Sequence, residues 1–394
     1  MPSSVSVVLL AVIAWTGCGG SSGSGTTTKK ISNIKNRVFV SNAQSGYVQN
    51  VDADKDHLAG TAFDILINGS PTFMDSTPDH KNIAVYDATF NSVAVVNSDI
   101  EDRTAKASLD NVSDSIRITS DALFVYAAVR NRVNSSGPNG AVQVLDVTKS
   151  VISASYPVPN ARWIALSNDN KKLLAFPDDN SNTPYYIDLS VNAPAAVPIP
   201  GNYDHPIAAY FSSDNTKAYI LNCGPECGGA QASVTELTIS GFSQRTVAVP
   251  AATVATLDGT TLYVAGQTAS SGVVSVVDTG AMTVTSSTPI GNGRHGVIRS
   301  VSGKVWIGAT GCNGGGCLSV FDPSSGNVIV DNPAAGSASK GDVTGMDFDT
   351  PKNLMYVCEG GELLRYDQNG APVSTLVDIV GNAYDVRAVP PFTK

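Results

Sequence analysis

The sequence predicts an all-β protein with a single β-propeller of eight four-stranded blades. Three observations lead to this prediction. Short apolar strand pairs recur about every 45 residues, each pair is flanked by further strands, and the chain ends on a strand without a partner. A repeat of this length with several strands per unit is typical of a β-propeller. Seven blades is the alternative, because residues 63–109 carry the weakest pattern.

The two central strands of each unit are the clearest part of the repeat. The first reads RVFV at Arg37 and TLYVA at Thr261, and a polar loop separates it from a second apolar run, which predicts a hairpin. The first strands begin at Arg37, Asn82, Ala122, Lys172, Lys217, Thr261, Lys304 and Asn353. The second strands begin at Tyr47, Val93, Val142, Tyr185, Val234, Val273, Leu318 and Leu363.

Two outer segments complete each unit. Strands preceding the pair are expected from Pro71, Ser115, Arg162, Ile207, Thr253, Gly296, Thr344 and Tyr384. Trailing strands are expected from Phe63, Ser153, Ala196, Arg245, Thr283 and Val328. No preceding strand comes before Arg37, and residues 384–389 form a lone one at the end. We therefore expect the last strand to complete the first blade and close the ring, which leaves no exposed sheet edge there.

The strand pairs resemble the YVTN-type repeat of the YncE-like bacterial β-propeller proteins, whose units read roughly LYVAN, a short loop and TVSVID. Residues 261–296 (TLYVAGQTASSGVVSVVDT…) and 82–100 resemble it best, and the resemblance covers most of the chain. It implies the propeller fold. It leaves function open, because propellers include binding proteins and enzymes alike.

Composition narrows the range of partners. The chain of 394 residues is 42% hydrophobic, which is enough for a large core, and only 15% charged, with a net charge of −9. Its 25 Lys and Arg residues form no basic run. Binding to a phosphate backbone needs such a patch, so no nucleic-acid partner is expected.

The N-terminus carries a predicted export signal. The apolar run of residues 5–15 is too short to span a bilayer and suits the core of a signal peptide. It leads into Thr16, Gly17, Cys18 and a Gly/Ser/Thr stretch, which resembles a bacterial lipoprotein signal.

That resemblance implies that residues 1–17 are a signal peptide, that Cys18 is acylated, that residues 18–35 form a flexible tether and that residues 36–394 form the propeller. The protein would be lipid-anchored in the bacterial cell envelope and face the periplasm or the cell exterior. The alternative is an ordinary cleaved signal with a chance cysteine.

Close cysteine pairs predict two hairpin disulfides. Cys223 with Cys227 and Cys312 with Cys317 both fall between the paired strands of a blade, and an exported protein favours oxidation. A zinc site made of all four thiolates is the alternative. Cys358 has no nearby partner in the sequence and is expected to be a buried free thiol.

Recurring aspartates end the second strand of most units. A position repeated in this way predicts a cap on the following turn, with a cation-binding ring as the alternative. The residues are Asp52, Asp146, Asp188, Asp278, Asp322 and Asp367. Asp52, Asp54 and Asp56 also have the spacing that opens a calcium loop, but His57 and Phe63 stand where such a loop needs Gly and Glu, so an acidic hairpin turn is expected.

Two histidines mark the expected mouth of the channel. His205 follows Asp204 and His295 follows Arg294, in both cases just before the first strand of a blade. Loops at this place lie on the same face of a propeller as the loops that hold the cysteine pairs. These four residues are therefore candidate binding residues, and histidine can also serve as a base or a metal ligand.

Three arginines share a register in the preceding strands of their blades. Arg117, Arg299 and Arg387 are expected either to place positive charge along the channel wall or to pair with acids there. They complete the set of candidate binding residues.

No motif predicts a catalytic residue, a metal site or a cofactor, because nucleophile elbows, phosphate loops and zinc-protease signatures are all absent from the sequence. The leading hypothesis is a monomeric, non-catalytic binding or scaffold module whose variable loops recognise a protein, a glycan or a small ligand. The alternative is an enzyme of the propeller lactonase or dehydrogenase-subunit kind that uses His205, His295 and neighbouring acids.

Overall fold

The computed structural model describes residues 31–131, 139–179, 181–312, 316–330, 341–373, 377–389 and 391. The expected signal peptide, Cys18 and residues 18–30 of the expected tether lie outside this part of the chain. Residues 31–35 lie inside it. Ser32 is buried there, and its N–H donates to the carboxylate of Glu101 at 2.6 Å.

Eight antiparallel sheets make up the folded unit. Blade 1 contains β1 (Arg37–Asn42), β2 (Tyr47–Asp52), β3 (His57–Leu58), β4 (Ile65–Leu66) and the C-terminal β32 (Ala383–Val389). Blade 2 contains β5 (Pro71–Ser76), β6 (Asn82–Asp87), β7 (Ser92–Asn97) and β8 (Asp102–Ser108). Blade 3 contains β9 (Ser113–Ile118), β10 (Phe124–Arg130), β11 (Gly140–Asp146) and β12 (Val151–Pro157). Blade 4 contains β13 (Ala161–Leu166), β14 (Lys172–Pro177), β15 (Tyr185–Asp188) and β16 (Ala196–Pro198).

The second half of the chain repeats the plan. Blade 5 contains β17 (Pro206–Phe211), β18 (Lys217–Asn222), β19 (Ser233–Thr238) and β20 (Gln244–Ala248). Blade 6 contains β21 (Val254–Asp258), β22 (Thr261–Gln267), β23 (Gly272–Asp278) and β24 (Thr283–Ile290). Blade 7 contains β25 (Arg294–Val301), β26 (Lys304–Thr310), β27 (Leu318–Asp322) and β28 (Asn327–Val330). Blade 8 contains β29 (Val343–Asp349), β30 (Leu354–Glu359) and β31 (Glu362–Asp367).

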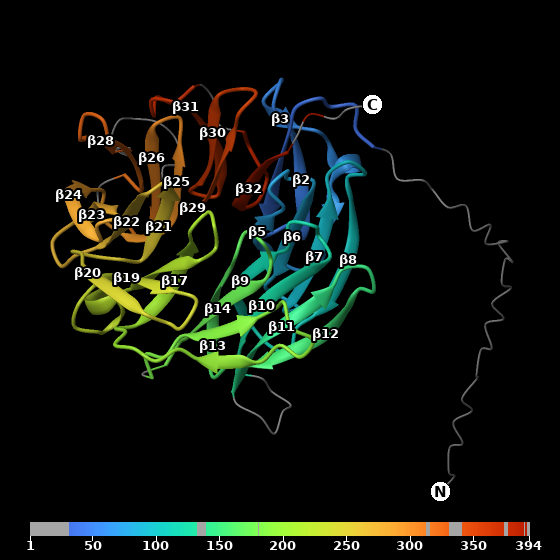
Figure 1. Cartoon of the computed structure of the whole chain (residues 1–394). Coiled ribbons are helices and arrows are strands. Elements are labelled where there is room, and N and C mark those ends of the chain that lie inside the picture. Colours follow the sequence, from blue (N-terminus) through green and yellow to red (C-terminus); the bar gives the residue numbers. More distant parts are fainter. Residues whose placement is uncertain are drawn as a thin grey trace, which may run out of the picture. The chain divides into compact units, whose positions relative to one another are not determined.

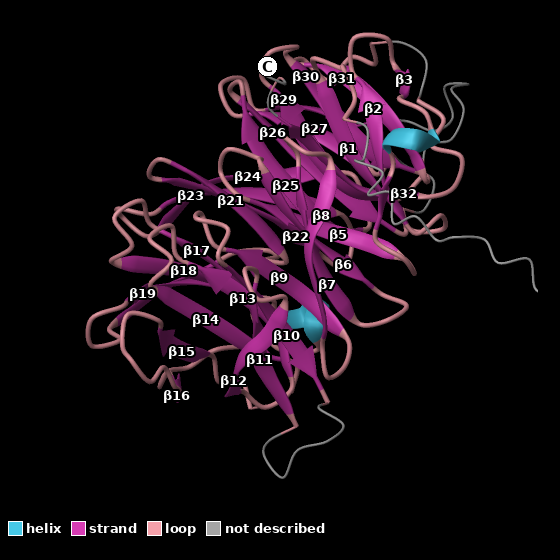
Figure 2. Ribbon diagram, turned by 90° about the vertical axis from the view of Figure 1, so that its right-hand side faces the viewer, coloured by secondary structure: helices cyan, strands magenta, loops and turns pink. Residues whose placement is uncertain are grey.

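The sheets form a closed ring, which confirms the predicted eight-bladed propeller. The innermost strand of every blade contacts the innermost strands of both neighbouring blades, and strands such as β8, β12, β20 and β24 lie toward the rim (Figure 1). Figure 2 shows how little helix accompanies the strands. The described chain has only two short 3₁₀ segments, η1 (Thr61–Phe63) and η2 (Gly224–Cys227).

The C-terminal strand closes the ring as predicted. β32 pairs antiparallel with β1, with Phe39 opposite Arg387 and Val40 opposite Val386. The weakest unit in the sequence is nevertheless a complete blade, because β5 to β8 form a four-stranded sheet. The outer strand of blade 1 is split into β3 and β4, which both pair with β2.

The core lies between adjacent blades. Val38 and Val40 pack against residues of blade 8, whereas Phe39 packs against blade 2. Successive side chains of a strand point to opposite faces, and both faces of an inner strand are covered by a neighbouring blade. This is why the central strands read as continuous apolar runs and not as an alternation of apolar and polar residues.

The recurring aspartates are turn caps, as predicted. A carboxylate oxygen of each accepts the backbone N–H of a residue two or three positions further along; for Asp188 the donor is Ser190, at 2.9 Å. The Asp52–Asp54–Asp56 hairpin is tied to cations, since Asp54 pairs with Lys352 and Asp56 with Arg365 of blade 8.

Candidate binding site at the channel mouth

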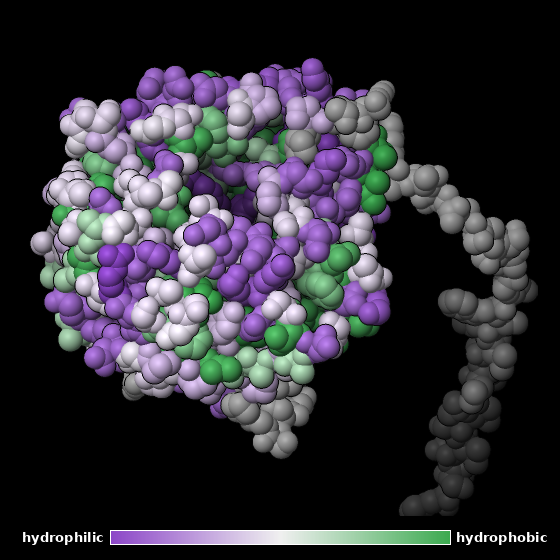
Figure 3. All heavy atoms as spheres, viewed as in Figure 1, coloured by the Kyte–Doolittle hydropathy of each residue, from purple (hydrophilic) through white to green (hydrophobic). Residues whose placement is uncertain are grey.

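A cavity of about 1040 Å³ opens at the centre of the ring. Figure 3 shows a central hollow whose walls are coloured as hydrophilic. Six consecutive blades, from blade 2 to blade 7, contribute to its lining. Representative lining residues, in chain order, are Phe73, Arg117, Trp163, His205, Thr253 and Arg294.

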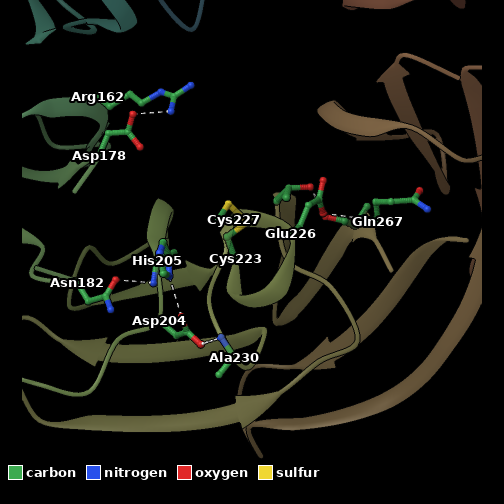
Figure 4. Close-up of a disulfide and its surroundings, with 12 residues drawn as sticks. Arg162, Asp178, Asn182, Asp204, His205, Cys223, Glu226, Cys227, Ala230 and Gln267 are labelled. Carbon is green, nitrogen blue, oxygen red and sulfur yellow. Dashed lines mark hydrogen bonds and ion pairs between the residues drawn. A yellow bond between two sulfur atoms is a disulfide. The ribbon is translucent and has the colours of Figure 1, made fainter. Parts of the chain in front are cut away.

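A histidine and an aspartate form a hydrogen-bonded pair at the edge of this cavity (Figure 4). His205 Nδ1 lies 2.8 Å from Asp204 Oδ1, and the second carboxylate oxygen accepts the N–H groups of Ala230 and Gln231, both at 2.7 Å. Although burial acts to raise it, the hydrogen bonds from His205 and these two N–H groups hold the pKa of Asp204 below its usual value. The imidazole is therefore held in one orientation by a charged partner.

The backbone around this pair is specialised. His205 has a left-handed conformation (φ 53°), which is uncommon for a residue with a side chain, and its N–H donates to Asn182 Oδ1 at 2.9 Å. At Gly229 a Cβ would lie 1.8 Å from Asp204 Oδ1, so only glycine fits beside the carboxylate.

The first disulfide loop supplies an acid to the same cavity. Cys223 is bonded to Cys227, as predicted, and Glu226 lies between them in η2. Glu226 Oε2 accepts the N–H of Gln267 at 2.8 Å. Burial raises the pKa of Glu226, against the opposing effects of that N–H and of the positive charge of Arg294.

The second pair is also oxidised as predicted. Cys312 is bonded to Cys317 in blade 7, and Cys358 is a buried free cysteine. The four paired thiols are therefore not available to a zinc ion.

Arginines and acids of blades 3 and 4 form an ion-pair network on another side of the cavity. Arg162 Nη1 lies 2.7 Å from Asp178 Oδ2, and Arg130 Nε lies 2.8 Å from Asp114 Oδ2. The Arg162 guanidinium also stacks on the ring of Trp163, 4.3 Å from its centroid. This network is neutralised internally and holds the aromatic face of Trp163 at the cavity.

The two residues that begin β25 differ in exposure. Arg294 is exposed and lines the cavity. His295 is buried, and its Nε2 lies 3.0 Å from the carbonyl oxygen of Gly291. Burial lowers the pKa of His295 to about 4, so the ring is neutral at pH 7.

The three arginines of shared register have different surroundings. Arg117 is exposed and lines the cavity, whereas Arg299 is half-buried and is not among the residues that line it. Neither forms an ion pair with a carboxylate in the described ranges; each donates from Nη1 to the carbonyl oxygen of the residue before it. Arg387 is buried and pairs with Asp385 at 2.7 Å. Of the three arginines, Arg387 alone forms an ion pair with an acid among the described residues.

The structure brings most of the sequence-derived candidates together. His205, Arg294, His295 and Arg117 line one cavity, and Asp204 supports it from behind. Asp342, another acid next to a first strand, accepts the N–H of Gly311 at the mouth. No group of three or more His, Cys, Asp or Glu side chains within the described residues is arranged to hold a metal ion.

Sequence reasoning missed several lining residues. Trp163, Tyr210 and Glu226 were not singled out. A signal for one of them was present, because Tyr210 occupies the same register as Arg117. Trp163 is the third residue of β13 and lies two positions before that register. Glu226 left no such signal, because it lies in a loop unique to blade 5.

Comparisons with known proteins show similarity in structure but not in sequence. No family model matches this sequence, and no curated protein sequence matches it. The structure is similar to that of NirN, described as a dihydro-heme d1 dehydrogenase in complex with DHE (TM-score 0.69, 13% identity, covering 92% of this chain and 76% of that one). It is also similar to the computationally designed protein Ika8 (TM-score 0.61, 13% identity, 89% and 95% covered). A third similar structure is the periplasmic gluconolactonase PpgL of Pseudomonas aeruginosa (TM-score 0.54, 14% identity, 90% and 99% covered). At these identities the similarity shows the β-propeller fold alone.

Proposed function

We propose that this propeller is a binding module that holds a small anionic ligand with a flat or apolar body at the mouth of its channel. The observation that carries the proposal is the pair of exposed arginines, Arg117 and Arg294, which line the cavity without an ion-pair partner in the described part of the chain. Arg294 acts electrostatically on the Glu226 carboxylate but forms no ion pair with it. A guanidinium that forms no ion pair in a concave site is suited to bind a carboxylate, sulfate or phosphate group.

The remaining lining supports the same class of ligand. Trp163 and Phe73 offer aromatic surface, and ligand sites in proteins typically combine such surface with a few placed polar groups. The cavity of about 1040 Å³ is large enough to enclose a whole small molecule and too concave for a flat protein surface. In this proposal the propeller works as a monomer and needs no cofactor.

A matched pair of probes tests the proposal. Isothermal titration of 4-biphenylcarboxylate and of its neutral amide should show binding of the anion alone. Arg294→Gln should raise the dissociation constant of the anion by roughly tenfold, which is the order expected for the loss of a charge-assisted hydrogen bond. Arg245→Gln is the control, because Arg245 lies on the outer strand β20 and pairs with Glu236. Equal binding of acid and amide, or no effect of Arg294→Gln, would contradict the proposal.

A second candidate function is hydrolysis of an ester or lactone, and the Asp204–His205 pair favours it. A carboxylate that orients an imidazole next to a cavity is the arrangement of a general base. The base takes a proton from water as the water oxygen attacks the carbonyl carbon, and the proton passes to the alcohol oxygen that leaves. Gluconolactone is a suitable probe, because a protein of the same fold is named a gluconolactonase.

The test of this second function is a rate comparison. If it is correct, the wild type accelerates gluconolactone hydrolysis, His205→Gln abolishes the acceleration, and Asp204→Asn reduces it. A wild-type rate equal to the buffer rate rules out this substrate class.

The cellular location of the protein is also part of the proposal. No helix in the part of the chain that the structure describes has the length and apolar content of a membrane span. We infer export and lipid anchoring through Cys18 from the lipoprotein-type signal, and membership of the YVTN-type group from the repeat. A Cys18→Ala variant should appear in the soluble fraction or remain unprocessed. Processing with unchanged membrane fractionation would place the anchor elsewhere.

A further inference from the structure

The inner strands of the eight blades place one equivalent residue each around the channel. In every blade this residue lies opposite the third residue of the adjacent strand in the same sheet, as Arg387 lies opposite Phe39 of β1 and Arg299 opposite Trp306 of β26. From blade 1 to blade 8 the residues are Arg387, Asp75, Arg117, Ala165, Tyr210, Thr256, Arg299 and Asp347. We call this set the channel layer.

One side of the channel layer is occupied by structural contacts. Arg387 lies among the carboxylates of Asp385, Asp347 and Asp75, whose negative charges all act on it. Each of these acids also accepts a backbone N–H from another inner strand, at 2.8 to 2.9 Å. The positive charge of Arg387 is thus compensated, and its neighbours serve to join blades 8, 1, 2 and 3.

The other side of the channel layer carries positive charge that is not compensated. Arg117 and Arg299 belong to blades 3 and 7, which face each other across an eight-bladed ring, and neither has a carboxylate partner among the described residues. Tyr210 stands between them in blade 5, and both guanidinium charges act on its hydroxyl. The intervening positions are the small residues Ala165 and Thr256, which leave space between the larger side chains.

Tyr210 can donate a hydrogen bond into this space. Its hydroxyl oxygen accepts the N–H of Ala255 at 2.9 Å, so the hydroxyl hydrogen is left for another acceptor. Tyr210 and Arg117 both line the cavity described above, so the channel layer is reached from the same mouth.

We propose that Arg117, Arg299 and Tyr210 form an inner oxyanion subsite, and that the ligand is an elongated dianion with one acidic group at Arg294 and the other at this subsite. The proposal rests on the proposed binding function and specifies its ligand class. β25 carries both Arg294 and Arg299, and a bulge between them places their partners Thr310 and Trp306 four positions apart on β26, which corresponds to about 13 Å of strand. A two-ring molecule with an acid at each end has a comparable length.

The experiment compares a monoanion with a dianion of the same body. Titrations use 4-biphenylcarboxylate and biphenyl-4,4′-dicarboxylate at constant ionic strength, on the full folded domain. The wild type is expected to bind the dianion at least tenfold more tightly. Arg299→Gln and Tyr210→Phe should each reduce this advantage and leave binding of the monoanion unchanged, while Arg294→Gln weakens binding of both probes.

The outcomes separate the two proposals. Equal affinities for the two probes in the wild type, or equal weakening of both by Arg299→Gln, overturn the inner subsite and leave the outer site standing. Failure of both probes to bind overturns the proposed function itself. Arg299→Lys is the second variant, because it keeps the charge if loss of the arginine disturbs folding, and it should retain part of the advantage.

Competition identifies the preferred acidic group. Inorganic phosphate that removes the dianion's advantage at millimolar concentration indicates a tetrahedral oxyanion. Competition by acetate and not by phosphate indicates a carboxylate. Chloride at the same ionic strength is the control. If neither phosphate nor acetate reduces the dianion's advantage more than chloride does, the inner oxyanion subsite is refuted.

Discussion

Replacing Glu101 with glutamine should destabilise the propeller by about 3–5 kcal/mol, the usual effect of breaking a buried ion pair. Glu101 and Arg37 are both fully buried at the side chain, and Arg37 Nη1 lies 2.9 Å from Glu101 Oε1. Asn50 Nδ2 and the N–H of Ser32 also donate to this carboxylate, at 2.9 and 2.6 Å. Glutamine keeps the volume and removes the charge, so the buried Arg37 guanidinium loses the negative charge that Glu101 supplies.

Urea unfolding at pH 7 measures this effect, with two spectroscopic probes to check that the transition has no intermediate. Asp99→Asn is the matched control. Asp99 pairs with Lys81 at 3.9 Å with both side chains half exposed, and an exposed pair of this kind contributes less than about 1 kcal/mol. If Glu101→Gln lies within about 1 kcal/mol of the wild type at an unchanged denaturant slope, the reasoning from burial and charge is refuted.

Three further predictions concern the ring, the disulfides and pH. Deleting residues 383–394 removes β32, so β1 should lose its hydrogen-exchange protection and the unfolding midpoint should fall; unchanged protection of β1 would contradict ring closure. Double Cys→Ser variants of Cys223–Cys227 and of Cys312–Cys317 should each lose about 2 kcal/mol, because such short loops restrict the unfolded chain only slightly; a loss above about 4 kcal/mol would contradict this. The pKa of His295 is lowered in the folded state, so the imidazole is protonated at a higher pH in the unfolded chain than in the folded protein. Stability from this group is fully present above pH 6.5 and is lost as pH falls toward 4, by about 3 kcal/mol. The unfolding free energy of His295→Gln should therefore change less than that of the wild type between pH 7.5 and pH 4.5, and equal pH dependences would refute the assignment.

The blade architecture could be predicted because the sequence signals of each blade lie within a few residues of one another. Apolar runs such as TLYVA at Thr261, the loops after them and the capping Asp278 all act within a few residues of one another. Their recurrence identified eight units even where residues 63–109 were degenerate. Ring closure by residues 384–389 followed from counting strands, since the first unit lacked one.

The candidate site was only partly predictable. His205 and Arg294 were found because they stand at matching places in the repeat, and the cysteine pairs because their partners are close in sequence. Trp163 and Tyr210 looked like ordinary strand residues, because a strand pattern does not distinguish a side chain that faces a channel from one that faces a neighbouring blade.

The sequence by itself favoured eight blades, the closing strand, the turn caps and the disulfide pairing over their alternatives, because each depends on contacts within one repeat or on the count of repeats. Only the tertiary structure decided which arginines carry free charge. Arg117, Arg299 and Arg387 are equivalent in the repeat, yet Arg387 meets the carboxylates of Asp347 and Asp75 from other blades, whereas Arg117 and Arg299 meet none in the described chain. Charge compensation depends on which charged side chains the closed ring brings together, and Arg387 and Asp75, for example, come from opposite ends of the described chain.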